Sequence, residues 1–388
     1  MTEPRAEPAS LRVAMTLEQC WHRVPGGTTV ATLGAATALA SRADLEVVGV
    51  AAWHRTEAIE AWRPPVPVTH LPLPRLALYE SWHRLRRPRV QTATGPVDVI
   101  HATAMPIPPP SAPLVVTIHD LAFLRSADHF TRRGNSFFRR GLELALRDAD
   151  LVLCPSKATI GDCIEAGFPA AKLRLVPHGV TVQNPTPDEV ARVRRHHGLD
   201  RPYVLWTGTV EPRKNLAGLL SAWAMVDAEA DLVLVGPAGW NTDLEALLRG
   251  AGSAGPQSKR GAGSAEPRVK VLGFLPHRDL APIYAGAEVF CYPSFTEGFG
   301  LPVLEAMAQS TPVVTSLGTS TEEIGGDATI LVDPADPAAI AEGIARILGD
   351  AELGSRLASK GRARAATYTW EVAAELTLAA YREVAWPR

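Results

Sequence analysis

The chain has 388 residues, a length at which a single hydrophobic core usually gives way to two, so two domains are expected. Hydrophobic residues make up 46% and charged residues 21%, which is typical of a globular protein and excludes a disordered one. The formal net charge of -2 provides no overall attraction to nucleic acid or to an anionic membrane, so nucleic acid is not an expected partner.

The first residues and the cysteines narrow the class of protein further. Residues 1–10 are polar and lack the apolar region of a secretory signal. No apolar run approaches the ~20 residues that a membrane span needs. The four cysteines have no CxxC spacing, and Cys154 and Cys291 lie inside apolar runs, where a buried thiol is the ordinary interpretation. We therefore expect a cytoplasmic protein without a disulfide framework or a zinc site.

Short apolar runs alternate with helix-like segments along the first half of the chain. The expected strands are 11–17, 47–52, 97–103, 113–120, 151–156 and 173–180. Helical segments such as 28–41 and 137–149 separate them. Nearly continuous apolar strands separated by amphipathic helices are typical of a parallel sheet covered on both faces.

A polar stretch with turn residues and a short charged helix interrupts this pattern at 182–202. The alternation then resumes, with expected strands at 203–209, 231–238, 268–275, 289–294, 312–316 and 329–334. Two such runs predict an α/β protein with two doubly wound, Rossmann-like domains. The predicted boundaries are 1–185 for the first domain, 186–368 for the second and 369–388 for a last helix.

The segment 250–268 departs from the alternation. It is small, polar and nearly duplicated (GAGSAGP, GAGSAEP), so it buries little apolar surface and is expected to be a mobile surface loop. It also contains G-x-G-x-x-G at Gly250, Gly252 and Gly255. That fingerprint requires a strand before it and a helix after it, and neither is expected here, so we attribute the match to chance.

The stretch 289–309 combines an apolar strand, a glycine-rich turn and a proline suited to begin a helix. Such a turn directs backbone N–H groups and a helix N-terminus toward an anionic phosphate. Gly298 and Gly300 allow the backbone to approach a ligand closely. Glu297 and Glu305 flank this turn and could accept hydrogen bonds from sugar or ribose hydroxyls. Alone, Glu297 is equally consistent with a solvated loop charge, and Glu305 with a partner of the helix dipole.

Two further segments follow expected strands. GTVEPRKNL (208–216) carries Arg213 and Lys214 at the carboxyl end of a strand, where ligands of open α/β sheets bind. This pair could neutralise a diphosphate leaving group, or it could be a solvated basic pair. In the first half, Gly26 and Gly27 follow the first strand, as in a tight turn.

His119 and Asp120 end the strand 113–120, which places the histidine at the rim of a site unless it is simply a structural histidine.

Together these segments resemble the retaining GT-B glycosyltransferases of family 4, also called GT4. E-G-F-G-L-P-x-L-E-A-M-A (297–308) is similar to the glutamate–seven–glutamate motif of that family, and E-P-R-K-N-L (211–216) to its diphosphate clamp. The resemblance covers nearly the whole chain. It implies a GT-B fold, in which two Rossmann-like domains face each other across a cleft. The first domain would take the acceptor, the second the nucleotide-sugar donor, and the last helix would pack back on the first domain.

The resemblance also implies a role for each candidate residue. Glu297 would bind donor-sugar hydroxyls, Glu305 the ribose, and Arg213 and Lys214 the diphosphate. His119 would face the reaction centre with Asp120 as an orienting partner. The remaining donor-binding positions would act largely through their backbone; they are Gly26, Gly27, Gly208, Phe274, Leu275, Gly298, Phe299, Gly300 and Leu301. H-G-V at 178–180 stands where the family has N-G-V, so we leave the role of His178 open.

The implied activity is retaining transfer of a hexose, with mannose as our expectation, from a nucleotide diphosphate sugar to a glycan, lipid-linked or small-molecule acceptor. No Asp-x-Asp motif follows an expected strand, and neither a metal nor another cofactor is expected. A nucleotide-sugar epimerase or a phosphorylase of the same fold, and a non-catalytic sugar-binding protein, are the alternatives. A nicotinamide dehydrogenase would need the dinucleotide fingerprint, which both domain starts lack.

Arginines are concentrated in two segments of the first domain, mixed with Leu76, Leu78, Trp82 and Leu85 in the first of them. They are Arg75, Arg84, Arg86, Arg87 and Arg89, and then Arg132, Arg133, Arg139 and Arg140. Basic residues among apolar ones can rest on an anionic membrane or guide an anionic acceptor. We therefore hypothesise an anionic acceptor or carrier, with peripheral contact at the inner face of the membrane; a solvated helix face is the alternative.

Overall fold

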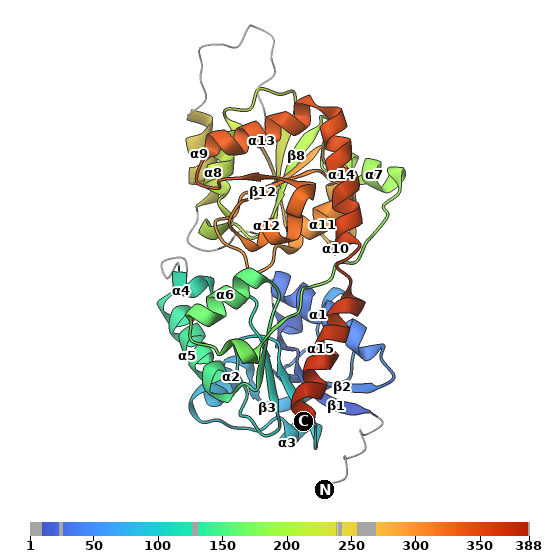
Figure 1. The fold of residues 1–388 in the computed structure, drawn as a ribbon. Helices are drawn as coiled ribbons and strands as arrows, with labels where there is room; N and C mark the ends of the chain where they lie inside the picture. Colours follow the sequence, from blue (N-terminus) through green and yellow to red (C-terminus); the bar gives the residue numbers. More distant parts are fainter. Residues whose placement is uncertain are drawn as a thin grey trace. The chain divides into compact units, whose positions relative to one another are not determined.

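A computed structural model of the chain describes residues 10–22, 26–125, 131–237, 239, 243–253 and 269–386 (Figure 1). The expected surface loop lies mostly outside these residues, as does Gly255, the third glycine of the G-x-G-x-x-G match. The chain divides into two compact units. Unit 1 comprises Met1–Leu121, Thr131–Gly179 and Trp370–Arg388, and unit 2 comprises Ala122–Phe130 and Val180–Thr369. The chain therefore passes from unit 1 into unit 2 and returns to unit 1 for its last helix.

Unit 1 contains a parallel sheet of seven strands among its described residues, in the order β3-β2-β1-β4-β5-β6-β7. The strands are β1 Leu11–Thr16, β2 Leu45–Trp53, β3 Val68–Pro74, β4 Val99–Ala102, β5 Leu114–Thr117, β6 Leu151–Cys154 and β7 Leu173–Leu175. The helices are α1 Gly27–Ala40, α2 Arg75–Arg84, α3 Gln91–Thr94, α5 Arg132–Asp148, α6 Lys157–Glu165 and α15 Trp370–Ala385.

Unit 2 contains a second parallel sheet, with six strands in the order β10-β9-β8-β11-β12-β13 across its described part. The strands are β8 Tyr203–Thr207, β9 Asp231–Val235, β10 Val269–Gly273, β11 Val289–Tyr292, β12 Val313–Ser316 and β13 Thr329–Val332. The helices are α4 Ala122–Arg125, α7 Pro187–His196, α8 Leu216–Trp223, α9 Leu244–Ser253, α10 His277–Ala285, α11 Leu301–Ala308, α12 Ser320–Gly325, α13 Pro337–Gly349 and α14 Ala351–Ala365.

The predicted fold class is confirmed: the chain is α/β with two sheets of parallel strands, the architecture of the GT-B fold. Each expected strand is present. Strands β4 and β6 of the first sheet and β8, β9, β11 and β12 of the second are buried along their whole length. Strand β3, which pairs with β2 at the edge of the first sheet, is not among the strands expected from the sequence. Proline cannot donate a hydrogen bond to a neighbouring strand, but it is tolerated at sheet edges. Pro72 and Pro74 therefore interrupt the strand pattern in the sequence although the segment forms an edge strand.

The last helix, α15, packs on the sheet and on α1 of unit 1 (Figure 1). Its buried face contributes Ala373, Leu378 and Tyr381 to the core of that unit. The Tyr381 hydroxyl lies 2.7 Å from His101 Nδ1 at the centre of the sheet. A Cβ atom at Gly34 of α1 would lie 2.3 Å from the Trp370 ring, so glycine is what lets the start of α15 approach α1. The C-terminal helix is thus part of the core of unit 1.

Candidate active site

The loop after β8 in unit 2 is built by two glycines and an asparagine. Gly208 follows the strand with φ +152°, and Gly236 follows the neighbouring β9 with φ +140°. A Cβ atom on Gly236 would lie 1.8 Å from the carbonyl oxygen of Gly208, so the two strand ends touch through backbone alone. Asn215 ends the loop in the left-handed region and caps α8 through Gly218 N–H. Its amide also donates to the carbonyls of Pro293 and Pro334, which ties the loop to the ends of β11 and β13.

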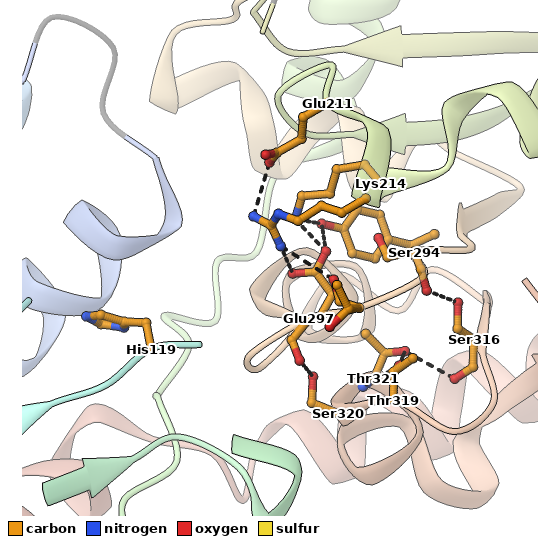
Figure 2. Close-up of polar contacts among 12 residues, drawn as sticks. His119, Glu211, Lys214, Ser294, Glu297, Ser316, Thr319, Ser320 and Thr321 are labelled. Atoms are coloured by element: carbon orange, nitrogen blue, oxygen red, sulfur yellow. Dashed lines mark hydrogen bonds and ion pairs between the residues drawn. The ribbon is translucent and has the colours of Figure 1, made fainter. Parts of the chain in front are cut away.

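Between Gly208 and Asn215 the loop presents Arg213 and Lys214 to Glu297, which follows β11 (Figure 2). Lys214 Nζ lies 2.5 Å from Glu297 Oε1, and Arg213 Nη1 lies 3.1 Å from Glu297 Oε2. The Tyr292 hydroxyl donates to the same Oε1 at 3.0 Å and contacts Lys214 Nζ. On its other side, Arg213 Nη2 lies 3.1 Å from Glu211 Oε1. Two cations and two carboxylates therefore form one network at the carboxyl ends of the strands.

The network is buried, and this decides its charge state. The side chains of Lys214 and Glu297 are 9% and 7% exposed. Burial alone would raise the pKa of Glu297, but Lys214 and Arg213 outweigh it and lower that pKa to about 2. Burial and the neighbouring Arg213 lower the pKa of Lys214, and Glu297 only partly offsets them. Because two cations lie beside it, Glu297 is ionised at neutral pH, and its negative charge opposes the loss of a proton from Lys214.

The glycine-rich turn after Glu297 leads directly into α11. Gly300 caps the helix with φ +107°, and a Cβ atom there would lie 2.8 Å from Thr321 Cγ2. Pro302 occupies the first turn, as predicted, and no side chain caps the helix N-terminus. The Ser320 hydroxyl donates to the Glu297 carbonyl at 2.8 Å, so α12 holds the turn in place (Figure 2). Val303 N–H and Leu304 N–H donate to the Gly300 carbonyl and Pro302 has no N–H, so the start of α11 offers an anion the N–H of Leu301 and the positive end of the helix dipole.

Glu305 lies one turn into α11 and is not bonded to the network around Glu297. Its Oε2 accepts from the Tyr284 hydroxyl at 2.9 Å, and that hydroxyl is 2.7 Å from Thr207 Oγ1 at the end of β8. Burial raises the pKa of Glu305 to about 7, although the hydrogen bond from Tyr284 opposes the shift. Glu297 and Glu305 thus have opposite pKa shifts, because only the first has cations beside it.

In unit 1, His119 and Asp120 follow β5. His119 Nε2 lies 2.9 Å from the carbonyl oxygen of Thr103, and His119 Nδ1 lies 3.2 Å from His178 Nε2. Burial lowers the pKa of His119, partly offset by the bond to Thr103 and by the charge of Asp120. Gly26 caps α1 and Gly27 is its first residue; the cap has φ -117°, so no left-handed backbone requires this glycine. Residues 23–25, which precede it, lie outside the described part of the chain.

Comparison with known proteins places the chain in a family. Residues 25–184 match the model described as Glycosyltransferase Family 4, and residues 201–350 match that of Glycosyl transferases group 1. The O-antigen chain mannosyltransferase B of Escherichia coli is 31% identical over 276 residues, which cover 69% of this chain and 70% of that one. The chain belongs to glycosyltransferase family 4. The matched region spans 62% to 71% of the lengths of eight relatives in this family.

Two further comparisons agree with the assignment of this chain to glycosyltransferase family 4. The MMP alpha-(1->4)-mannosyltransferase of Mycolicibacterium hassiacum is 30% identical over 311 residues, covering 74% of this chain and 71% of that one. The crystal structure of HepE from Anabaena in complex with UDP-glucose is 21% identical, with a TM-score of 0.72, and covers 95% of this chain and 99% of that one. The second similarity shows that the two proteins share a fold.

The other predicted donor residues of the glycosyltransferase differ in exposure. Phe299 and Leu301 are buried, whereas the Phe274 side chain is 55% exposed and its neighbour Leu275 is buried. Gly298 and Gly300 lie in the turn before α11. Phe274 follows Gly273 at the carboxyl end of β10. This aromatic side chain therefore follows the carboxyl end of a strand, as the charged network does, in the same sheet.

Several residues that shape this site of the glycosyltransferase were not predicted from the sequence. Tyr292 and Tyr284 bond the two glutamates, and Glu211 pairs with Arg213. Glu211 is the first residue of the 211–216 motif that resembles the family's diphosphate clamp, so the sequence could have indicated it. The tyrosines lie in an apolar strand and in a helix, where an aromatic residue ordinarily indicates core packing. His178 was noted only for departing from the family pattern.

Proposed function

We propose that this family 4 glycosyltransferase transfers a hexose from a nucleotide diphosphate sugar to an acceptor hydroxyl with retention of the anomeric configuration. The observation that carries the proposal is the pair Arg213 and Lys214, held at the carboxyl ends of the strands beside the open N-terminus of α11. Two fixed cations beside the positive end of a helix dipole match a diphosphate, on which negative charge builds up as the sugar departs.

In this proposal the bond between the anomeric carbon and the phosphate oxygen breaks first, and the sugar becomes oxocarbenium-like. A bond then forms from the acceptor oxygen to the same face of that carbon. The acceptor hydroxyl passes its proton to the departing phosphate oxygen, so atoms and charges balance without an enzyme nucleophile. Glu297 would bind sugar hydroxyls as an ionised carboxylate, and Glu305 would bind the ribose. Arg213 and Lys214 would stabilise the leaving group.

Mannose is the sugar that we propose. Support comes from the two relatives named above, both of which are mannosyltransferases by name. The nucleotide is open, because a structural neighbour was solved with UDP-glucose. A thermal-shift series with UDP, GDP, ADP and dTDP tests the nucleotide, since the tightest ligand raises the melting temperature most. NMR of the product from the matching sugar nucleotide then reports its anomeric configuration, and an inverted product would refute retention.

We propose that transfer needs no metal ion, because Arg213 and Lys214 already supply the positive charge that a metal would bring to the diphosphate. The rate should be unchanged after EDTA treatment and should not respond to added Mg²⁺ or Mn²⁺. A rate that falls with EDTA and returns with one of these ions would contradict this proposal while leaving the rest of the mechanism in place.

The acceptor proposal rests on the basic face of α2 and α5 in unit 1. The two helices pack through Tyr79 and Phe137, whose ring centroids are 5.7 Å apart. Arg86 does not belong to this face, because it bonds inward to Asp148 and to three backbone carbonyls. Leu76 and Leu85 are 59% and 72% exposed beside the exposed arginines, which are Arg84, Arg87, Arg89, Arg132, Arg133, Arg139 and Arg140. Charge complementarity favours an anionic acceptor or carrier here.

Two measurements test this face. Co-sedimentation with vesicles should increase when anionic lipid is added, and replacing the seven exposed arginines with glutamine should abolish the increase. Acceptor KM should rise in the same variant if the acceptor itself is anionic. No helix of the described residues is long and apolar enough to cross a membrane. Binding that ignores lipid charge, with an unchanged acceptor KM, would contradict the proposal and favour a neutral glycan or small-molecule acceptor.

A GT-B-like epimerase, a phosphorylase and a non-catalytic sugar-binding protein remain the competing assignments for the same fold. Each predicts a different product when the sugar nucleotide and candidate acceptors are supplied together. An epimerase returns an altered sugar nucleotide, a phosphorylase requires inorganic phosphate, and a binding protein leaves the donor intact. A new glycosidic bond with release of the nucleoside diphosphate is the result that we expect.

A further inference from the structure

The contacts of His119 assign one proton in unit 1 without ambiguity. A carbonyl oxygen only accepts hydrogen bonds, so the 2.9 Å contact between His119 Nε2 and the Thr103 carbonyl requires a hydrogen on that nitrogen. His119 Nδ1, the other ring nitrogen, faces His178 Nε2 at 3.2 Å. The ring centroids are 5.2 Å apart. One hydrogen lies between the two rings, and it belongs to whichever nitrogen is the donor.

Burial decides which nitrogen donates. Burial lowers the pKa of His119, against smaller opposing effects of Thr103 and Asp120. Burial and the proximity of His119 lower the pKa of His178 well below its ordinary value. His101, the other titratable residue facing the shared cavity, has a pKa of about 3 because it too is buried. With both rings neutral and His119 protonated at Nε2, the Nε2–H of His178 must donate to the lone pair of His119 Nδ1.

We propose that His178 is a positioning residue: it holds His119 in one tautomer and one ring orientation, with both of its ring nitrogens occupied by the protein. This inference deepens the proposed function, because it rests on the place of His119 beside the transferred sugar. A ring whose only lone pair is already bonded does not accept the proton of the acceptor hydroxyl. His119 then contributes a fixed neutral surface, and the proton passes to the leaving phosphate.

A cavity beside the two rings determines how the proposal is tested. It has a volume of about 30 Å³ and is lined by the three histidines His101, His119 and His178, by four threonines (Thr32, Thr103, Thr117 and Thr377) and by largely apolar side chains. This volume is enough for about two water molecules. A small residue at position 178 would therefore admit water, which could donate to His119 Nδ1 in place of the histidine. His178→Leu fills the space without a donor, whereas His178→Gln carries an N–H at about the reach of imidazole Nε2.

The first measurement is NMR of the full-length protein with ¹⁵N-labelled histidine. We expect neutral His119 and His178, each with its hydrogen on Nε2, at pH 7. In His178→Gln the His119 signals should keep this pattern, while in His178→Leu the Nδ1 signal of His119 should move toward that of a nitrogen without a hydrogen bond. His83→Gln is the matched control, since His83 is another buried histidine of unit 1 and bonds to the Met105 carbonyl.

The second measurement is kinetic. His178→Leu should lower kcat by about tenfold to a hundredfold, the loss expected when a catalytic group shifts by about 1 Å, with donor KM unchanged. His178→Gln should restore kcat to within about threefold. The double variant His119→Ala/His178→Leu should be no slower than His119→Ala alone, because His178 acts only through His119.

The outcomes separate the positioning role from the proposed function. A His119 that carries its hydrogen on Nδ1, or that is charged at pH 7, would overturn the positioning role whatever the kinetics show. Additive losses in the double variant would also overturn it. If His119→Ala retains full kcat while the NMR pattern is as expected, then the place of His119 in the reaction is wrong and the assignment of the histidine pair stands.

Discussion

Lys214 and Glu297 have opposite charges and side chains that are less than a tenth exposed. The sequence leaves open whether Lys214 belongs to a solvated basic pair. The structure shows a lysine buried against Glu297 and Tyr292, so that alternative is wrong for this residue. Removing one member of a buried ion pair leaves the other charge unpaired, which is costly.

Arg213→Ala and Lys214→Ala should therefore both impair transfer but should differ in stability. Each should lose on the order of 3 kcal/mol of transition-state stabilisation, the loss expected for one electrostatic donor. Lys214→Ala should in addition lower the free energy of unfolding by about 3 kcal/mol, because Glu297 stays buried, loses the nearer of its two cations and keeps only Arg213. Steady-state kinetics and urea denaturation measure the two effects.

Lys360→Ala is a matched control, since this lysine forms an exposed ion pair with Asp327 in the same unit. This substitution should lower the free energy of unfolding by less than about 1 kcal/mol. The double variant Arg213→Ala/Lys214→Ala should show no measurable transfer. If it retained activity, the assignment of a diphosphate clamp would be lost.

Glu305 provides a pH dependence of known sign. Its pKa is about 7 in the folded protein, against an ordinary value of 4.5. Between these pH values the folded state therefore binds more protons than the unfolded state. The free energy of unfolding should consequently fall as pH rises from about 5 to above 7, by on the order of 3 kcal/mol. Glu297 contributes no change in this window, because its pKa is lowered to about 2 and its contribution is lost only as pH falls below about 4.5.

Glu305→Gln should remove this dependence. The variant should melt at a higher temperature than the parent at pH 8.5 and at nearly the same temperature at pH 5.5. If Glu305 binds the donor ribose, donor KM should rise in the same variant, so stability is gained where binding is lost. Thermal denaturation at the two pH values tests the first effect, and an equal melting difference at both would show that Glu305 is ionised throughout.

At the scale of elements, the strands were predictable because parallel strands covered on both faces are apolar along their length. The edge strand β3 was not, since its prolines are the sequence signal of a turn. Similarly, the motifs located Glu297, Arg213 and Lys214, because each follows directly on a predicted strand. They could not reveal that Tyr292 and Tyr284 bond the two glutamates, or that His178 bonds His119. The Tyr284–Glu305 and His119–His178 pairs join residues 21 and 59 positions apart, and the Tyr292–Glu297 bond depends on how the turn after β11 folds back.

The strand ends of unit 2 give a prediction at this scale. Gly236 has φ +140°, and any Cβ there would lie 1.8 Å from the Gly208 carbonyl oxygen. The clash is with backbone and cannot be relieved by a side-chain rotation. Gly236→Ala should therefore destabilise the protein by on the order of 3 kcal/mol and displace the loop that carries Arg213 and Lys214. We expect nucleotide affinity to fall with stability, measured by calorimetry on the same sample.

The matched control for this substitution is Gly161→Ala. Gly161 lies within α6 of unit 1, where nothing would come within 4 Å of an added Cβ and the backbone is helical. Alanine there should stabilise the protein by about 0.5–1 kcal/mol, because the unfolded chain loses freedom. Equal effects of the two substitutions would mean that the contact between the ends of β8 and β9 does not constrain the loop.

At the scale of the whole molecule, the chain passes between the two units more than once. One passage joins Gly179 to Val180 and another joins Thr369 to Trp370. The two connecting segments bond to each other within unit 2, where Val180 N–H donates to the Tyr368 carbonyl. Within unit 1, the rings of His178 and Trp370 lie 6.3 Å apart. The proposed positioning residue thus stands where the chain leaves unit 1, next to the residue at which it returns.

Because α15 completes the core of unit 1, a cavity made there should destabilise one unit selectively. Tyr381 is fully buried, packs in that core and bonds His101. Tyr381→Ala should cost about 3–5 kcal/mol, as large-to-small changes in a core do, and should lower the melting temperature of unit 1 by on the order of 10 °C. Tyr381→Phe keeps the ring and loses only the hydrogen bond, so its effect should be about 1 kcal/mol.

The donor nucleotide should act on the other unit. Its proposed ligands, Arg213, Lys214 and Glu305, all belong to unit 2, so a nucleoside diphosphate at about a hundred times its Kd should stabilise that unit by about 2.7 kcal/mol. Scanning calorimetry of Tyr381→Ala should then resolve two transitions, of which only the upper one moves when nucleotide is added. If both transitions move together, or if one transition persists in the variant, the two units unfold cooperatively. Stability would then be a property of the whole chain, and substitutions far from the nucleotide, such as Tyr381→Ala, should weaken its apparent affinity.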